Sequence, residues 1–358
     1  PRHTSCNQRG LKPLSLAYQR WPSLPCIALL HVQVSSAECG RMSGTSGDSI
    51  LVTGALGQIG SDLVEALRDK HGQDSVIASD VREIAGHPFV EEGRFVRLSV
   101  LDGDAMDSTI EEQGVGTVYH LAAILSATGE QNPELCERVN VGGTITVLEA
   151  ARRHGLRVYA PSSIAVFGPD APDTAPQVTP LNPTTIYGKT KVTGEVMAMN
   201  YWKQYGVDTR GIRYPGLVSW KSPPGGGTTD YAVEIFHAAL NEGHYDCFVS
   251  PETRLPMMYM DDAIRATLEL MEAPSDSIGD ARGGYNVSAM SFTAGELADT
   301  ISERVDGFTC EFKPDHRQAY ADSWPDAVDD AVARGDWGWR AEYDLTRMVD
   351  EMLDRLSD

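Results

Sequence analysis

The chain of 358 residues contains few cysteines, few lysines and no apolar run of membrane length. Its six cysteines form no Cys-x-x-Cys pair and no cluster with histidine, which argues against a structural zinc site and suggests a reducing compartment. The apolar run at residues 24–34 is broken by Pro25, Cys26 and His31 and is too short to span a bilayer. We therefore expect no metal and no membrane-spanning segment.

Basic charge is also scarce. Lysine and arginine together number 30 against 51 aspartates and glutamates, and the net charge is −21. A nucleic-acid-binding protein needs a basic surface for phosphate contacts, and an anionic membrane surface would repel this chain. Only seven residues are lysine, and an Asp-rich, Lys-poor surface suits a cytoplasm of high salt. We expect neither nucleic acid nor membrane as a partner.

Residues 1–48 differ from the rest, because they hold five basic residues against two acidic ones and show no long periodic pattern. Two interpretations stay open. The segment is a transit peptide that directs the protein to the mitochondrial matrix, or it is upstream sequence and translation starts at Met42. We favour the second and a cytoplasmic location. This leader is expected to be disordered or non-native.

From residue 49 to residue 213 strand and helix patterns alternate along the chain. Short apolar strand patterns occur at residues 49–54, 75–80, 94–100, 116–123, 156–163 and 207–213. Long helix patterns occur at Pro133–His154 and Thr184–Tyr205. The alternation predicts an α/β fold with a doubly wound parallel sheet, covered by helices on both faces, as in the Rossmann fold.

The regularity drops after Arg213. We expect a first domain over residues 49–215 and a small C-terminal lobe, for the substrate, over 216–358. Residues 255–273 read as a strand and a helix that return to the first domain. Asp261 and Asp262 stand where this helix begins, so we expect them to cap it.

A glycine-rich turn follows the first strand pattern. In "TGALGQIG" the residues Gly54, Gly57 and Gly60 have the spacing G-x-x-G-x-x-G between a strand and a helix. Glycine permits a tight turn and the close approach of phosphate to backbone N–H groups, including those of Gln58 and Ile59 at the helix start. This context predicts a dinucleotide site and makes residues 49–215 a cofactor domain.

Asp80 ends the second strand pattern, twenty positions after Gly60. A carboxylate at this place accepts hydrogen bonds from the adenosine ribose hydroxyls and repels a 2′-phosphate. The cofactor is therefore expected to be NAD and not NADP. Arg82 is close enough to leave NADP open.

Tyr187 and Lys191 have the spacing i, i+4 in "YGKTK", which places both on one face of a helix. An ammonium near a phenol favours the phenolate and moves its pKa from about 10 toward neutral pH. Ser162 and Ser163 close the fifth strand pattern, where a hydroxyl can meet a substrate oxygen. Tyr187 is therefore the candidate general base.

Together these residues resemble the extended branch of the short-chain dehydrogenase/reductase superfamily, which includes the NAD-dependent epimerases and dehydratases. The resemblance implies that Tyr187 is the general acid/base, that Lys191 holds the nicotinamide ribose and lowers the Tyr187 pKa, and that Ser163 orients the substrate, with Ser162 as the alternative. It matches Asn140 to the family's helix asparagine. Further cofactor contacts that it implies are Val100, Leu121, Ala122, Ala123 and Tyr214.

Longer segments, such as "RYPGLVS" and "DSWPDAVDDAVARGDWGW", are similar to the short-chain type of L-threonine 3-dehydrogenase. This similarity implies NAD-dependent oxidation of L-threonine to 2-amino-3-ketobutyrate in threonine catabolism, without a metal. It also implies a homodimer built from the helices at Pro133–His154 and Thr184–Tyr205. The alternatives are a sugar-nucleotide epimerase or dehydratase and a catalytically silent NAD-binding protein of the same fold.

Four further residues are candidates for substrate contact beside Ser163 and Tyr187. A small zwitterion needs hydroxyls and backbone donors for its carboxylate. The candidates are Ser126, Thr228, Thr229 and Trp324. The loop Pro223–Thr229 is a candidate lid. The alternatives are helix capping for the two threonines and core packing for the tryptophan.

Overall fold

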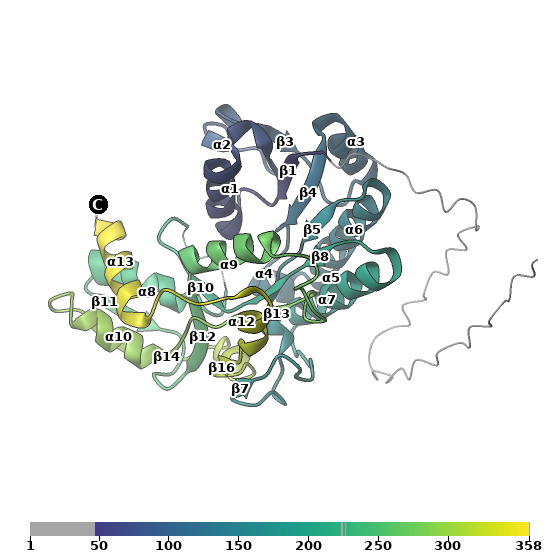
Figure 1. Cartoon of the computed structure of the whole chain (residues 1–358). Coiled ribbons are helices and arrows are strands. Elements are labelled where there is room, and N and C mark those ends of the chain that lie inside the picture. Colours follow the sequence, from purple (N-terminus) through teal and green to yellow (C-terminus); the bar gives the residue numbers. More distant parts are fainter. Residues whose placement is uncertain (1–46, 223–224, 226, 358) are drawn as a thin grey trace, which may run out of the picture. The chain divides into compact units, whose positions relative to one another are not determined.

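The computed structural model describes residues 47–222, 225 and 227–357 (Figure 1). These residues belong to one compact unit. The expectations for residues 1–46 lie outside the described residues. Within the described ranges no helix combines the length and the apolarity that crossing a membrane requires.

The centre of the fold is a six-stranded parallel sheet with the order β3-β2-β1-β4-β5-β8. The chain moves outward from β1 to β3, then crosses back to β4 on the other side of β1. The order therefore reverses between β1 and β4, where open α/β sheets bind ligands at the carboxyl ends of the strands. The predicted doubly wound fold is confirmed. The strands are β1 (Ser49–Thr53), β2 (Val76–Asp80), β3 (Phe95–Arg97), β4 (Val115–His120), β5 (Arg157–Tyr159) and β8 (Thr209–Arg210).

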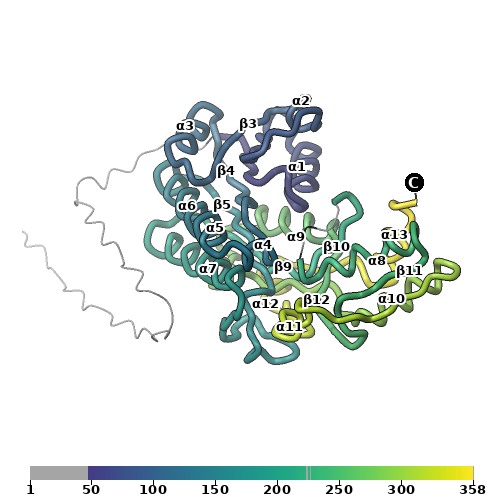
Figure 2. The backbone as a smooth tube through the Cα atoms, turned by 180° about the vertical axis from the view of Figure 1, so that it is seen from behind, coloured from purple at the N-terminus to yellow at the C-terminus, as the bar shows by residue number. Residues whose placement is uncertain are grey.

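Helices cover both faces of this sheet because side chains alternate along buried strands. Leu51 packs on one face, with residues of α3 (Gly103–Gln113) and α6 (Gly143–His154). Its neighbours Ile50 and Val52 pack on the other face, with α1 and α9. The helices of that face are α1 (Gln58–His71) and α9 (Met260–Glu272), and Figure 2 shows the arrangement from behind.

Two predicted strands break into two pieces each. The first piece lies in the central sheet, and the second joins a small parallel sheet, β13-β9-β6. The breaks fall at Pro161, which has no N–H to donate, and at Gly211, where a Cβ would lie 2.4 Å from the Ala160 carbonyl oxygen. These strands are β6 (Ser162–Ser163), β9 (Ile212–Tyr214) and β13 (Tyr285–Asn286).

The helix predicted at 133–154 also divides. It consists of α5 (Pro133–Glu137), a π-helical turn at Arg138–Gly142, and α6. A π turn inserts one extra residue and is frequent at functional sites. The second long helix, α7, spans Ile186–Tyr205, and the Thr185 hydroxyl accepts a hydrogen bond from the Gly188 N–H at 3.0 Å to cap it.

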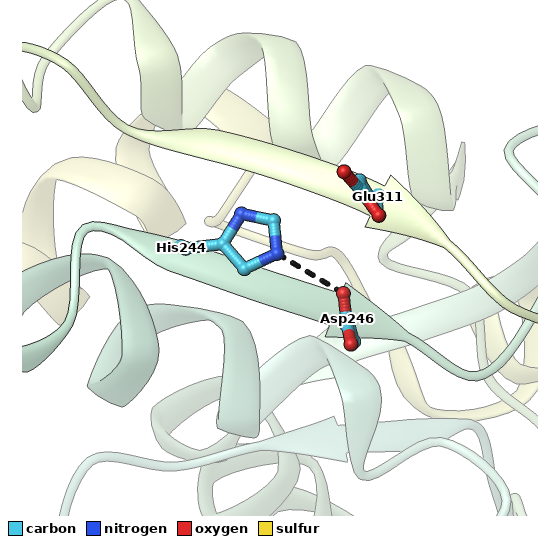
Figure 3. Close-up of side chains that lie close together, drawn as sticks. All are labelled: His244, Asp246 and Glu311. Atoms are coloured by element: carbon cyan, nitrogen blue, oxygen red, sulfur yellow. Dashed lines mark hydrogen bonds and ion pairs between the residues drawn. The ribbon is translucent and has the colours of Figure 1, made fainter.

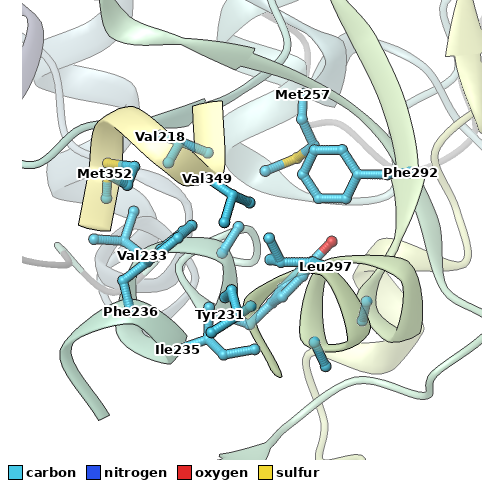
Figure 4. Close-up of a cluster of buried hydrophobic side chains, with 14 of the residues drawn as sticks. Val218, Tyr231, Val233, Ile235, Phe236, Met257, Phe292, Leu297, Val349 and Met352 are labelled. Carbon is cyan, nitrogen blue, oxygen red and sulfur yellow. The ribbon is translucent and has the colours of Figure 1, made fainter. Parts of the chain in front are cut away.

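The C-terminal lobe has its own core. A three-stranded sheet, β10-β12-β14, packs with helices α8, α10 and α13, and Figure 4 shows side chains of this cluster, including Tyr231, Phe292 and Val349. The elements are β10 (Gly216–Val218), α8 (Tyr231–Asn241), β12 (Arg254–Tyr259), β14 (Met290–Thr293), α10 (Ala294–Ser302) and α13 (Leu345–Ser357). Short elements complete the fold: α2 (Pro88–Glu91), α4 (Ser126–Gln131), β7 (Thr174–Ala175), β11 (His244–Cys247), β15 (Thr309–Phe312), α11 (Gln318–Ala321), β16 (Ala327–Val328) and α12 (Ala331–Trp337).

The strand and the helix predicted at 255–273 belong to different parts of the fold. β12 pairs with β10 and β14 in the lobe, whereas the apolar face of α9 packs with α1 over the central sheet. The domain boundaries at residues 48 and 215 stay a prediction.

Asp261 and Asp262 do not cap α9 as expected. The N-cap is Tyr259, and the Asp262 carboxylate instead accepts hydrogen bonds from the backbone N–H groups of Glu342 and Tyr343, at 3.0 to 3.1 Å, and from Arg265 at 2.6 Å. Asp261 accepts from the Tyr343 hydroxyl at 3.1 Å. Asp262 is 1% exposed. The pair therefore fastens the C-terminal segment onto α9, because Glu342 and Tyr343 come from 80 to 82 residues further along the chain.

We expect Asp262→Asn to lower the free energy of unfolding by about 2 kcal/mol, because a buried charge-assisted contact to three donors is weakened. Urea unfolding followed by circular dichroism measures the change. Asp261→Asn is the matched control, since Asp261 is exposed and makes one contact, and its effect is expected within about 0.5 kcal/mol. Equal losses in the two variants would contradict this assignment.

Candidate functional site

The glycine turn brings β1, β4 and α1 into contact at the point where the strand order reverses. Gly54 has φ of 71°, and a Cβ there would lie 2.7 Å from the Ala122 backbone nitrogen. A Cβ at Gly60 would lie 2.3 Å from the Gly54 carbonyl oxygen. Gly57 is the N-cap of α1 and has no side chain to offer, so the first N–H groups of α1 can bind a phosphate.

Asp80 lies beside this turn, at the end of β2, and is 5% exposed. Its carboxylate accepts the Leu56 N–H at 3.2 Å and the Arg82 N–H at 3.0 Å. The Arg82 guanidinium adds contacts at 3.0 and 3.2 Å. Burial acts to raise the pKa of Asp80, but these hydrogen bonds hold it below its usual value. Asp80 is thus a carboxylate, already paired with Arg82.

Asn140 lies in the π turn and connects the loop after β4 to the helix α7. Its Oδ1 accepts the Ile124 N–H at 2.8 Å. Its Nδ2 donates to the Ile124 carbonyl at 3.0 Å and to the Thr190 hydroxyl at 3.1 Å. The π turn aims this amide at both neighbours, so it holds the loop of Leu121, Ala122 and Ala123 close to α7.

Tyr187, Lys191 and Ser163 come together at the start of α7. Lys191 Nζ lies 5.6 Å from the centroid of the Tyr187 ring and donates to the Pro161 carbonyl at 2.9 Å. Ser163 forms a hydrogen bond with the Tyr187 side chain. Ser162 faces the other way and donates to Glu195 Oε1 at 2.6 Å. The geometry therefore favours Ser163 over Ser162 as the hydroxyl beside Tyr187.

The electrostatics of this group differ from our expectation. Burial raises the pKa of Tyr187 to about 12, and the hydrogen bond with Ser163 opposes this only in part. Burial also lowers the pKa of Lys191 to about 8. The expected lowering of the Tyr187 pKa is therefore not found here, because the loss of solvent outweighs the hydrogen bond with Ser163.

His120 ends β4 next to Lys191. Its Nδ1 shares a hydrogen bond with the Thr53 hydroxyl at 2.9 Å. Burial and the Lys191 ammonium lower the pKa of His120 to about 3, so the imidazole is neutral at physiological pH. The neutral ring packs in the wall of the site.

Val100 and Tyr214 can serve a cofactor only through their backbones. The Val100 side chain belongs to the core between the sheet and α6. The Tyr214 hydroxyl is hydrogen-bonded to the Tyr159 hydroxyl at 2.7 Å and to Thr267.

The candidate substrate residues lie in different surroundings. Ser126 starts α4, a helix that packs against α7, and is half-buried. The N-cap of α8 is Asp230, so helix capping does not account for Thr228 and Thr229. Trp324 packs against the apolar core of the lobe and against a second apolar cluster that contains Ile164, Phe167 and Val328. Of the candidate lid, residues 223, 224 and 226 lie outside the described residues.

Sequence reasoning missed the pair of Glu195 and Arg213 behind Lys191. The guanidinium donates to both carboxylate oxygens at 2.8 Å, and Glu195 is 9% exposed. The available signal was the spacing, because Glu195 follows Lys191 by four residues as Lys191 follows Tyr187.

Among the described residues, one group has the donors for a metal ion, and Figure 3 shows it on β11 and β15. It consists of His244, Asp246 and Glu311. The Lys313 ammonium already lies 2.8 Å from Asp246 and 2.9 Å from Glu311. A cation would have to displace this ammonium, so we assign no metal to the group.

Comparison with known proteins agrees with this geometry. The model of the NAD dependent epimerase/dehydratase family matches residues 50–287. A curated epimerase/dehydratase of Staphylococcus aureus, described as uncharacterized, is 47% identical over 309 residues, 86% of this chain and 96% of that protein.

Solved structures are similar over the same range. A monomeric L-threonine 3-dehydrogenase from a metagenome database is 52% identical with a TM-score of 0.83, covering 86% of this chain and 98% of that chain. A GalE-like L-threonine dehydrogenase of Cupriavidus necator, in a holo form, is 50% identical with a TM-score of 0.83, covering 86% and 99%. The family match and these identities together lead to one conclusion: the chain belongs to the NAD-dependent epimerase/dehydratase family.

Proposed function

We propose that the protein oxidises L-threonine to 2-amino-3-ketobutyrate with NAD. The observation that carries the chemistry is the convergence of Ser163, Tyr187 and Lys191 beside the glycine turn of β1 and α1. The choice of threonine rests on the structures about 50% identical that are described as L-threonine dehydrogenases. The same geometry also suits a sugar-nucleotide epimerase or dehydratase.

The dinucleotide fits the described residues. Gly54 and Gly60 allow β1, α1 and the loop after β4 to approach closely, Gly57 leaves the start of α1 without a side chain at its N-cap, and Asp80 offers oxygens to a ribose. When bound, NAD would supply the acceptor for the hydride that leaves the carbon carrying the substrate hydroxyl. The residues of the chain then have two tasks, which are to orient this hydroxyl and to take its proton.

Tyr187 takes the proton of the substrate hydroxyl in this proposal. The O–H bond breaks as the phenolate gains the proton, while the Ser163 hydroxyl holds the same oxygen in place. The pKa of about 12 in the cofactor-free site means that the phenol is protonated there. Formation of the phenolate therefore requires positive charge close by, and Lys191 lies on the same helix face to supply it.

We expect Tyr187→Phe to reduce kcat for L-threonine by about 10³-fold, because the proton acceptor is lost. NADH absorbance measures the rate. Tyr205→Phe, on the same helix but exposed, is the control and is expected to match the wild type. Full activity of Tyr187→Phe would refute the proposed base.

Turnover of a UDP-sugar but not of L-threonine would move the assignment to an epimerase or dehydratase. NAD binding without any turnover would indicate a catalytically silent protein.

Asp80 is expected to set the preference for NAD. In Asp80→Ser the repelling carboxylate is removed and Arg82 is released to pair with a 2′-phosphate. We expect the ratio of kcat/KM for NADP to that for NAD to rise about 10-fold to 100-fold. Asp80→Ser combined with Arg82→Gln is the control, and it is expected to lose most of this gain. An unchanged ratio in Asp80→Ser would exclude Asp80 as the determinant.

We also propose a homodimer in which α5, α6 and α7 form the contact. Ile145 on α6 and Val196 on α7 expose 43% and 54% of their surface. One similar dehydrogenase is described as monomeric, so the mass of this chain in solution distinguishes the two assemblies. Light scattering is expected to give twice the chain mass, and Val196→Lys is expected to shift it toward one chain. A single-chain mass for the wild type would refute the dimer.

A further inference from the structure

A small cavity lies beside Lys191 and Glu195. Its volume is about 30 Å³, enough for about two water molecules. Its lining combines alanine, proline and glycine residues with polar side chains, among them Asn140, Thr144, Ser162, Thr190, Lys191 and Glu195. A cavity of this size can hold water that hydrogen-bonds to the buried Lys191 ammonium without opening the site to solvent.

Glu195 is held rigidly at the wall of this cavity. It accepts Arg213 Nε at Oε1 and Arg213 Nη2 at Oε2, both at 2.8 Å, and Ser162 at 2.6 Å. Arg213 is itself fixed by the Gln177 carbonyl and the Asn286 side chain, both at 3.1 Å. The carboxylate therefore cannot turn away from the cavity without breaking a buried ion pair.

The charged and titratable groups around Lys191 come from four elements. They are His120 on β4, Cys136 on α5, Tyr187 and Glu195 on α7, and Arg213 on β9, which is paired with Glu195. His120 is neutral, and burial raises the pKa of the Cys136 thiol, which is therefore uncharged near neutral pH. Glu195, which is paired with Arg213, is the carboxylate that lines the cavity together with Lys191.

We propose that Glu195 is a positioning residue for the reaction: across the cavity, its fixed carboxylate keeps the Lys191 side chain charged and in place beside Tyr187. The importance of Glu195 for the reaction rests on the proposed oxidoreductase function. Its effect on the charge of Lys191 does not depend on that function. Burial favours the neutral amine. Because the Cys136 thiol is uncharged near neutral pH, the Glu195 carboxylate is the charge that opposes this effect there.

The scarcity of lysine makes a direct test possible. With ¹³C at the ε-carbon of lysine, seven signals at most report on the chain, and Lys191→Arg assigns the one that belongs to Lys191. The wild-type midpoint is expected at about 8. In Glu195→Gln the carboxylate that stabilises the ammonium is gone, so the midpoint is expected to fall by roughly one unit or more. The alkaline limb of kcat/KM against pH is expected to move down by a similar amount.

The ion pair of Asp208 and Arg210 provides a matched control. Asp208 pairs with Arg210 through the same two-bond geometry, at 3.0 and 2.8 Å, and Arg210 is 1% exposed. We expect Asp208→Asn to lower the melting temperature without moving the Lys191 midpoint. Glu195→Asp retains the charge and is expected to keep most of the wild-type midpoint.

A double variant guards against loss of folding, since Glu195→Gln leaves a buried guanidinium unpaired. Glu195→Gln with Arg213→Met removes both charges and is expected to keep a lowered midpoint. An unshifted midpoint in both variants, with only a lower melting temperature, would overturn the inference and make Glu195 purely structural. Because the titration needs no substrate, a lowered midpoint in a protein that does not oxidise threonine would refute the proposed function and leave the inference standing.

Discussion

The buried ion pair between Arg213 and Glu195 is the interaction on which the arrangement of the site depends. Removing a charge from water is costly unless a partner with good geometry replaces the solvent, so neither side chain can move alone. Arg213 also reaches the Asn286 side chain and stacks over the Phe167 ring, with 5.4 Å to its centroid. One guanidinium thereby fixes α7 relative to β9 and β13, and with α7 the place of Tyr187.

Backbone groups and side chains have different roles in the proposed site. The glycine turn offers N–H groups and a helix terminus to an anionic ligand, whereas the chemistry that we propose belongs to side chains on α7 and β6. This division explains how a chain with a net charge of −21 can present a dinucleotide site, since attraction comes from local dipoles and not from the total charge. Among the residues that the structure describes, Lys191 supplies the ammonium in the centre of this arrangement, and burial makes its charge state dependent on its neighbours.

Much of the fold could be predicted from the sequence because strands buried on both faces, such as β1, are continuous apolar runs bounded by glycine. The π turn at 138–142 was missed, since one extra residue hardly disturbs an apolar pattern. Local spacing placed Tyr187 beside Lys191 but carried no information on burial, which decides their pKa values. The roles of Asp262 and Glu195 depend on partners distant in sequence, at Tyr343 and Arg213, which local patterns do not reveal.

The helix α9 has a consequence for recombination between relatives. It packs over the central sheet, yet it follows a strand of the lobe, and its first turn holds the C-terminal segment near Tyr343. A chimaera joined at a single crossover after residue 215 would therefore combine one parent's sheet with the other parent's covering helix. Exchange of the lobe between relatives requires several short grafts on either side of α9, with α9 inherited from the parent that supplies β1 and α1.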